Sequence, residues 1–113
     1  MKLADCRYKC KQAYFRKSIF VKMFVKEVEK VYGVRLRTCE DFCKFYVLFL
    51  SVAEMLYGKH YNHAIFKAIV RGKPNLYMCI KCEQPFTAEE SITHTLQHMK
   101  QLGYKPLAYK ENI

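Results

Sequence analysis

The stretch YMCIKCEQPFTAEESITHTLQHMK, from Tyr77 to Lys100, decides the fold of the C-terminal part of this chain. It carries two cysteines and two histidines in the spacing C-x2-C-x11-H-x3-H. A tetrahedral zinc ion takes four Cys or His ligands, usually as two close pairs. We therefore predict a zinc site here. Its ligands are Cys79, Cys82, His94 and His98.

A helix is predicted from Thr87 to Leu102. Thr87 and Glu90 form a capping box at its start, and Gly103 ends it. Residues at i and i+4 share one face of a helix, so the two histidines would face the two cysteines of a preceding knuckle. This geometry leaves the four ligands little freedom.

The same helix lacks the side chains of a DNA-reading finger. Helix positions −1, 3 and 6 of such a finger contact bases, and here they are Thr87, Glu90 and Thr93. None is an Arg, Lys, Asn or Gln, the usual bidentate base readers. We do not expect this helix to recognise a DNA sequence. Non-specific contact with nucleic acid through other basic residues stays open.

The length of 113 residues allows one small domain or two very small ones. Very small modules need metals or disulfides to fold. The N-terminus has no apolar run of signal-peptide length, so we expect a reducing compartment, where clustered cysteines favour metal over disulfides. The six cysteines form three close pairs: Cys6 with Cys10, Cys39 with Cys43, and Cys79 with Cys82.

Two partitions of the remaining ligands are possible. The favoured one is a four-cysteine zinc site, because it leaves no cysteine pair without a partner and lets one metal hold the basic half together. Its ligands are Cys6, Cys10, Cys39 and Cys43. The other partition gives Cys39 and Cys43 two histidines, His60 and His63, and leaves the first pair unused.

The net charge of +10 is unevenly spread. Residues 1–37 carry 11 Lys or Arg against 3 acids, a net of +8, and residues 38–113 carry 9 against 7, a net of +2. A basic half attracts polyanions or acidic protein segments. The most apolar segment, 42–57, is interrupted by Lys44 and Glu54 and is short for a bilayer, so we expect a buried helix in a soluble protein, with no membrane partner.

The predicted fold class is α+β, a small zinc-stapled protein with two zinc modules, short β-hairpins and helices. Helices are expected over 18–30, 38–57, 60–71 and 87–102, and a short hairpin over 31–37. The domain organisation follows the metal sites. It comprises a four-cysteine module over 1–58 with its long helix, a linker segment over 59–75, and a finger-like module over 76–108.

The cysteine layout resembles the early protein six oncoprotein family of papillomaviruses, over roughly residues 6–95. That family carries two zinc modules, each with two cysteine pairs. The matching sequence segments are CKQ at Cys10, VYG at Val31, FCKFY leading into a helix that ends in LYG at Gly58, and CIKCEQPFTAEE. The chain departs from the pattern in two ways. Both pairs of the first module are C-x3-C, and the second module is shortened, with His94 and His98 in place of its closing cysteine pair.

The resemblance implies a viral adaptor with two zinc ions that acts in the host nucleus and cytoplasm. Such proteins bind acidic leucine-rich helical peptides of host proteins in a groove between the modules, and can redirect a cellular ubiquitin ligase or affect transcriptional regulators. The candidate partner-binding residues here are Arg35, Arg37, Lys44, Tyr46 and Leu50.

An enzyme is not expected. Catalytic zinc keeps an open coordination position, whereas both predicted sites have four protein ligands. Every cysteine has a metal role, so none is left as a nucleophile. The alternative function is a basic zinc-finger protein that binds nucleic acid non-specifically as a transcription regulator.

Overall fold

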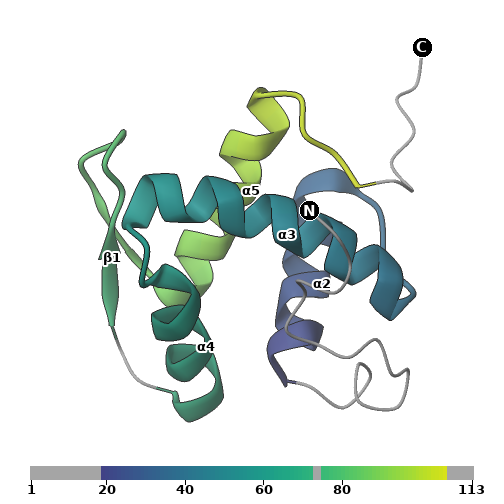
Figure 1. Cartoon of the computed structure of the whole chain (residues 1–113), viewed down its shortest axis with the longest axis horizontal. Helices are drawn as coiled ribbons and strands as arrows, with labels where there is room; N and C mark the ends of the chain where they lie inside the picture. Colours follow the sequence, from purple (N-terminus) through teal and green to yellow (C-terminus); the bar gives the residue numbers. More distant parts are fainter. Residues whose placement is uncertain (1–18, 73–74, 107–113) are drawn as a thin grey trace.

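A computed structural model of the chain describes residues 19–72 and 75–106. Four helices and one two-stranded antiparallel hairpin make up this part of the molecule, in agreement with the predicted α+β class (Figure 1). The elements are α2 (Ile19–Tyr32), α3 (Cys39–Tyr57), α4 (Tyr61–Arg71), β1 (Leu76–Met78), β2 (Pro85–Thr87) and α5 (Ala88–Gln101).

Local capping signals explain where α3 begins and ends. The Thr38 hydroxyl accepts a hydrogen bond from the Asp41 N–H at 3.1 Å and so caps the helix. At the other end, Gly58 has a φ of 103° and its N–H donates to the Glu54 carbonyl. The helix predicted over 38–57 is confirmed within one residue.

The capping box predicted for the last helix is complete. The Glu90 N–H donates to the Thr87 hydroxyl at 3.3 Å, and the Thr87 N–H donates to the Glu90 carboxylate at 3.0 Å. These reciprocal bonds provide acceptors for N–H groups at the helix start that have no acceptor within the helix. They fix the point where the chain leaves β2 and enters α5.

The hairpin predicted over 31–37 is wrong. Helix α2 continues to Tyr32, and Gly33, with a φ of 72°, ends it by donating its N–H to the Glu29 carbonyl at 2.8 Å. Residues 34–37 form no strand. Tyr32 and Leu36 are buried, so these strand-forming residues serve the core instead of a sheet.

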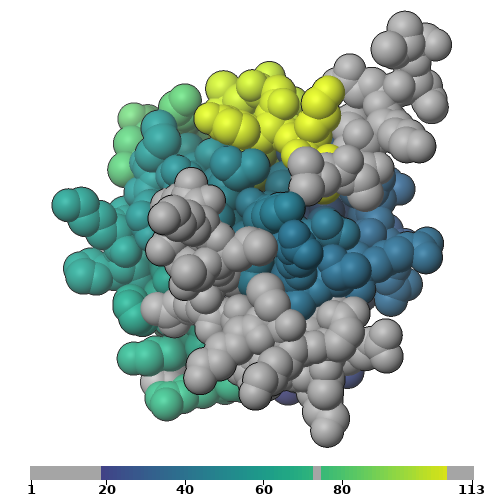
Figure 2. All heavy atoms as spheres, turned by 45° about the vertical axis from the view of Figure 1, so that its right-hand side comes forward, coloured from purple at the N-terminus to yellow at the C-terminus, as the bar shows by residue number. Residues whose placement is uncertain are grey.

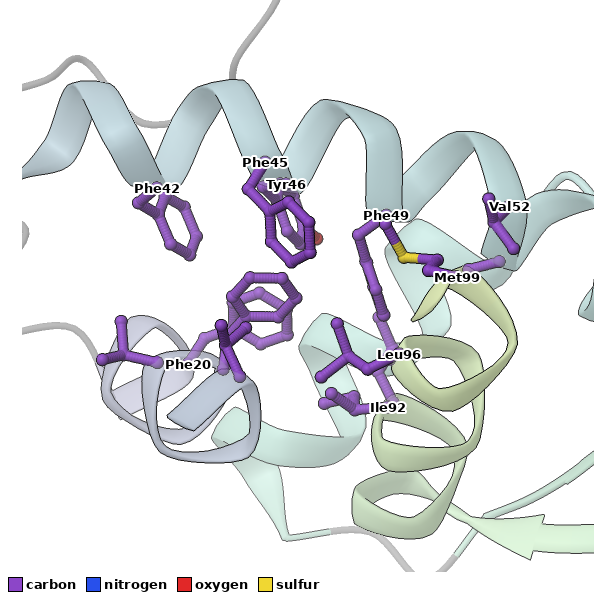
Figure 3. Packing of buried hydrophobic residues seen from close by; sticks show 14 of the residues in the cluster. Phe20, Phe42, Phe45, Tyr46, Phe49, Val52, Ile92, Leu96 and Met99 are labelled. Carbon is purple, nitrogen blue, oxygen red and sulfur yellow. The ribbon is translucent and has the colours of Figure 1, made fainter. Parts of the chain in front are cut away.

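Aromatic side chains dominate the core between α2 and α3. Phe24 of α2 makes edge contacts with Phe42, Tyr46 and Phe49 of α3, at centroid distances of 5.3, 5.2 and 4.9 Å. Figure 3 shows the aromatic residues of α3 pointing toward α2 on one side and toward Ile92, Leu96 and Met99 of α5 on the other. Such edge contacts add to the free energy gained by burial.

The core joins both halves of the chain. Helix α5 packs against α2 and α3, and Figure 2 shows its C-terminal end beside α3 on one face of the molecule. The segment 59–75, predicted as a linker, contains α4, whose Tyr61 and Ile65 are buried in the same core. Among the described residues, no helix has both the length and the apolar character that crossing a bilayer requires.

Candidate metal centre

The cysteine knuckle closes the β1–β2 hairpin. The strands pair with Tyr77 opposite Phe86, and the loop between them is held by two backbone bonds. The Cys79 N–H donates to the Gln84 carbonyl at 3.1 Å, and the Glu83 N–H donates to the Cys79 carbonyl at 2.8 Å. Glu83 has a φ of 54°, in the left-handed region that turns the chain back toward β2.

Helix α5 presents the two histidines to this knuckle. The His94 and His98 rings lie at 89° to each other, with centroids 4.5 Å apart. The His94 ring also stacks on Phe86 of β2, with centroids 4.2 Å apart and an interplanar angle of 22°. Since Phe86 belongs to the hairpin, this stacking orients His94 and joins the two halves of the site.

The four predicted ligands converge. Their ligand atoms all lie within 4.8 Å of one another. The Cys82 Sγ is 3.2 Å from His94 Nε2 and 3.5 Å from His98 Nε2, and the two Nε2 atoms are 3.1 Å apart. Zinc–sulfur bonds of about 2.3 Å and zinc–nitrogen bonds of about 2.0–2.1 Å place the ligand atoms of a tetrahedral zinc ion about 3.3–3.8 Å apart. The group of Cys79, Cys82, His94 and His98 could therefore hold a metal ion.

The pKa shifts describe the centre before a metal binds. Desolvation and then the neighbouring Cys79 raise the pKa of the Cys82 thiol above 9.0, so a metal must displace a proton from it at neutral pH. Desolvation and then His98 lower the pKa of His94 below 6.5. The metal-free fold therefore loses stability as the pH falls below 6.5, because the unfolded chain binds the proton more tightly.

The centre is anchored to the core. The Ile80 N–H of the knuckle donates to the Leu56 carbonyl at the end of α3, at 2.9 Å. On the helix side, the Ser91 hydroxyl is hydrogen-bonded to the Tyr61 hydroxyl of α4 at 2.8 Å. Tyr77 of β1 packs edge-on against the same tyrosine, with centroids 5.4 Å apart. The finger-like module is thus part of a larger packed unit.

The four-cysteine site stays a prediction. Cys39 and Cys43 are buried one turn apart on α3, with their Sγ atoms 4.0 Å apart, whereas Cys6 and Cys10 lie outside the described residues. Cys43 also takes part in a disulfide bond in this structure. A metal needs the thiolate form, so a zinc ion at this site requires the reduced protein.

The structure does not bring together the four residues of the rival partition, Cys39, Cys43, His60 and His63. Within residues 19–72 and 75–106, only the C-terminal group brings three or more potential ligands together. His60 instead precedes α4 as its N-cap residue, and His63 is exposed on that helix.

The predicted partner-binding residues occupy different environments. Arg35 and Arg37 are exposed and line a cavity of about 480 Å³ between α2 and the segment that follows it. Lys44 pairs with Glu40 at 3.2 Å, and Leu50 is half-buried against the core. Tyr46 is 1% exposed and donates its hydroxyl hydrogen to Asn62 at 3.1 Å, so it is a core residue. None of these last three lines the cavity.

Sequence reasoning missed most of this cavity. The other lining residues are Val21, Lys22, Val25, Lys26 and Leu36. The available signal was the pair Lys22 and Lys26, one turn apart on a basic helix that precedes Arg35 and Arg37 by about ten residues.

Comparisons with protein-family models, with curated proteins and with solved structures found no match for this chain. The resemblance to the papillomavirus family therefore rests on the sequence motifs alone.

Proposed function

We propose that this protein is a zinc-stabilised adaptor that binds acidic, leucine-containing segments of other proteins in a basic groove. The basic groove consists of Val21, Lys22, Val25, Lys26, Arg35, Leu36 and Arg37. The observation that carries the proposal is the composition of this lining. Among the described residues, the lining comprises four cations and three apolar residues, with no acidic side chain.

The arrangement of the cations suits an acidic peptide. Lys22 and Lys26 lie one turn apart on α2, so they point to the same side. Neither forms an ion pair with a described residue, and the same holds for Arg35. Val21, Val25 and Leu36 are 1%, 9% and 3% exposed, so they form the floor of the groove. Leucine side chains of a bound helix would pack on this floor and on the aliphatic stems of the lysines. A helical segment of a host protein, such as a ubiquitin ligase or a transcriptional regulator, would fit this chemistry in the nucleus or the cytoplasm.

Zinc has a structural role in this proposal. Two thiolates and two imidazoles form a closed four-ligand set typical of structural zinc, with no open position for a substrate. The same argument favours a non-enzymatic protein. A second ion would be bound by the four-cysteine site in the reduced protein.

Nucleic-acid binding is the second candidate, and the packing of α5 bears on it. At finger position 6, the Thr93 hydroxyl donates to the Glu27 carboxylate at 2.6 Å, and Glu27 is 4% exposed. Further along, the Lys100 ammonium donates to the Val31 carbonyl at 3.0 Å. This face of α5 therefore lies against α2 and beside a carboxylate that repels phosphates. Only non-specific binding through the basic groove remains as an alternative.

Elemental analysis of the protein purified under reducing conditions tests the metal content. We expect two zinc ions per chain, and Cys39→Ala should lower the content to one because it removes a ligand of the first site. His63→Ala is the control and should leave the content unchanged. A wild-type content of one that persists in Cys39→Ala would contradict the four-cysteine site.

Charge reversal tests the basic groove. We expect the double variant Lys26→Glu, Arg35→Glu to bind a synthetic helical peptide, with leucines on one face and Asp or Glu elsewhere, about tenfold or more weakly than the wild type. The reason is that two attractive charges become repulsive at the site. Fluorescence anisotropy of the labelled peptide measures the affinity.

A matched variant separates the groove from general electrostatics. Lys67→Glu with Arg71→Glu makes the same change of charge on the exposed face of α4, outside the groove. We expect it to retain most of the peptide affinity. Equal losses in both variants, together with tight and strongly salt-dependent binding of any DNA duplex, would favour the nucleic-acid alternative.

A further inference from the structure

Strand β1 and the knuckle that follows it carry three exposed apolar side chains. Leu76, Met78 and Ile80 are 67%, 57% and 66% exposed. Tyr77, between Leu76 and Met78, is buried, so Leu76 and Met78 share the outer face of the hairpin. Ile80 follows buried Cys79 in the turn. We call these three residues the β1 row. Isolated exposed apolar residues need no explanation, whereas a contiguous set marks an interaction site.

The backbone of β1 is open along one edge. N–H groups of a strand in an antiparallel pair point alternately toward and away from the partner strand. Cys79 donates its N–H across the hairpin to Gln84, so the N–H groups of Leu76 and Met78 point away from β2. Ile80 follows this alternation, because its N–H donates outside the hairpin to Leu56.

Two further observations support an open edge. Pro85 lies opposite Met78 and has no N–H, which fits a position that needs no hydrogen bond between the strands. Outside the hairpin, neither Leu76 nor Met78 donates its N–H to a described residue. Edge strands usually avoid pairing by carrying charges, prolines or bulges, and the β1 sequence LYM has no charged residue or proline.

We propose that β1 is a second docking site, which takes an extended acidic segment of a partner protein as an added strand. The open backbone edge favours binding of an extended segment, because such a segment can form main-chain hydrogen bonds with β1. The β1 row favours apolar side chains at alternate positions of that segment, since these would contact it across the strands.

The charge distribution selects an acidic partner. Lys81 follows Ile80 in the knuckle, and Lys59 is three residues after Leu56, whose carbonyl accepts the Ile80 N–H. Both lysines are exposed and form no ion pair with a described residue. In a second copy of this chain, the same two lysines would lie beside the edge, so like charges would meet there. An extended segment that alternates Glu or Asp with Val or Ile would meet all three requirements. Its backbone would hydrogen-bond to β1, its apolar side chains would contact the β1 row, and its carboxylates would be attracted to the two lysines.

This site is separate from the basic groove. Figure 1 shows β1 and α2 on opposite sides of the molecule, and no residue belongs to both sites. An adaptor that joins two proteins needs two such surfaces. The inference does not depend on the groove, because it rests on β1 alone.

A synthetic peptide that alternates Glu with Val or Ile is the probe for this site. We expect the wild-type protein to bind it, as measured by fluorescence anisotropy. The same peptide N-methylated at alternate residues should bind about tenfold or more weakly, since N-methylation removes the N–H donors of the added strand. This comparison leaves the protein unchanged, so it cannot be confused with misfolding.

Protein variants locate the site. Met78→Glu should weaken binding of the probe by about tenfold or more, whereas Leu102→Glu makes the same change at another apolar residue, 60% exposed, and should not. Lys26→Glu with Arg35→Glu should also leave the affinity unchanged. Zinc content and circular dichroism verify that each variant is folded.

Three results would overturn the proposal. The first is equal binding of the N-methylated and unmodified peptides. The second is an equal effect of Met78→Glu and Leu102→Glu, or loss of binding in the groove variant. The third is self-association of the wild type in sedimentation experiments that Met78→Glu abolishes, which would assign the edge to a second copy.

Discussion

His98→Ala is expected to abolish metal binding at the C-terminal centre and to unfold the hairpin together with α5. The variant leaves three ligands, and binding of a complete structural site contributes about 10–16 kcal/mol in zinc-finger peptides. The stability of a whole domain is about 5–15 kcal/mol. A two-stranded hairpin is at best marginally stable without such support. Elemental analysis and thermal unfolding followed by circular dichroism measure the two effects.

A control variant and chelation of the wild-type protein test the same prediction. His63→Ala removes an exposed histidine of α4 that is outside the metal group, and should keep both the metal and the melting temperature. Treatment of the wild type with a chelator should reproduce the His98→Ala result, because a structural metal supplies folding free energy. A metal-stripped wild type that melts at the original temperature would show that the core holds the module without a metal.

The parts of the fold that were predicted correctly depend on local interactions. Thr38 and Asp41 at the start of α3, and Thr87 and Glu90 at the start of α5, are three residues apart and bond to each other directly. The C-terminal metal group was predictable for a related reason. Each pair of ligands is close in sequence, and the two pairs belong to a hairpin and the helix that follows it.

The errors arose where tertiary packing overrides local preference. Val31 and Tyr32 favour a strand by residue type, but Tyr32 is buried at the end of α2 against Phe45, with ring centroids 5.5 Å apart. Helix α3 is apolar on several sides, so the sequence did not show that Tyr46 faces the core. Its environment depends on α2 and α4, which pack around it.

The two proposed docking sites could not be predicted from the sequence. Lys22 and Lys26 have the spacing of an ordinary solvated helix face. They become part of a groove only because residues 33–37 return alongside α2. Strand β1 has three residues, too few for a periodic pattern, and its exposed row became evident from the burial of Tyr77 between its neighbours.

Phe24→Ala is expected to cause the largest loss of stability among core variants. Phe24 is 0% exposed, and its ring contacts four aromatic rings of α3, from Phe42, Phe45, Tyr46 and Phe49. A buried Phe→Ala change costs about 3–5 kcal/mol through lost burial and the cavity left behind. This is a large share of the stability of a domain of this size. Urea unfolding at a fixed excess of zinc measures the loss without a change in metal occupancy.

Two comparisons decide whether the aromatic cluster or the metal holds α2 in place. Phe24→Leu keeps most of the buried volume and should cost less than Phe24→Ala, while Val70→Ala on the exposed face of α4 should change the unfolding free energy by about 0.5 kcal/mol or less. Because α2 carries Phe24 on its core face and Lys22 and Lys26 on its groove face, a folded Phe24→Leu protein should still bind the acidic helical peptide. If Phe24→Ala costs no more than Val70→Ala, the aromatic cluster does not determine the position of α2. The basic groove would then depend on the bonds between α2 and the metal-bearing helix, from Thr93 to Glu27 and from Lys100 to Val31.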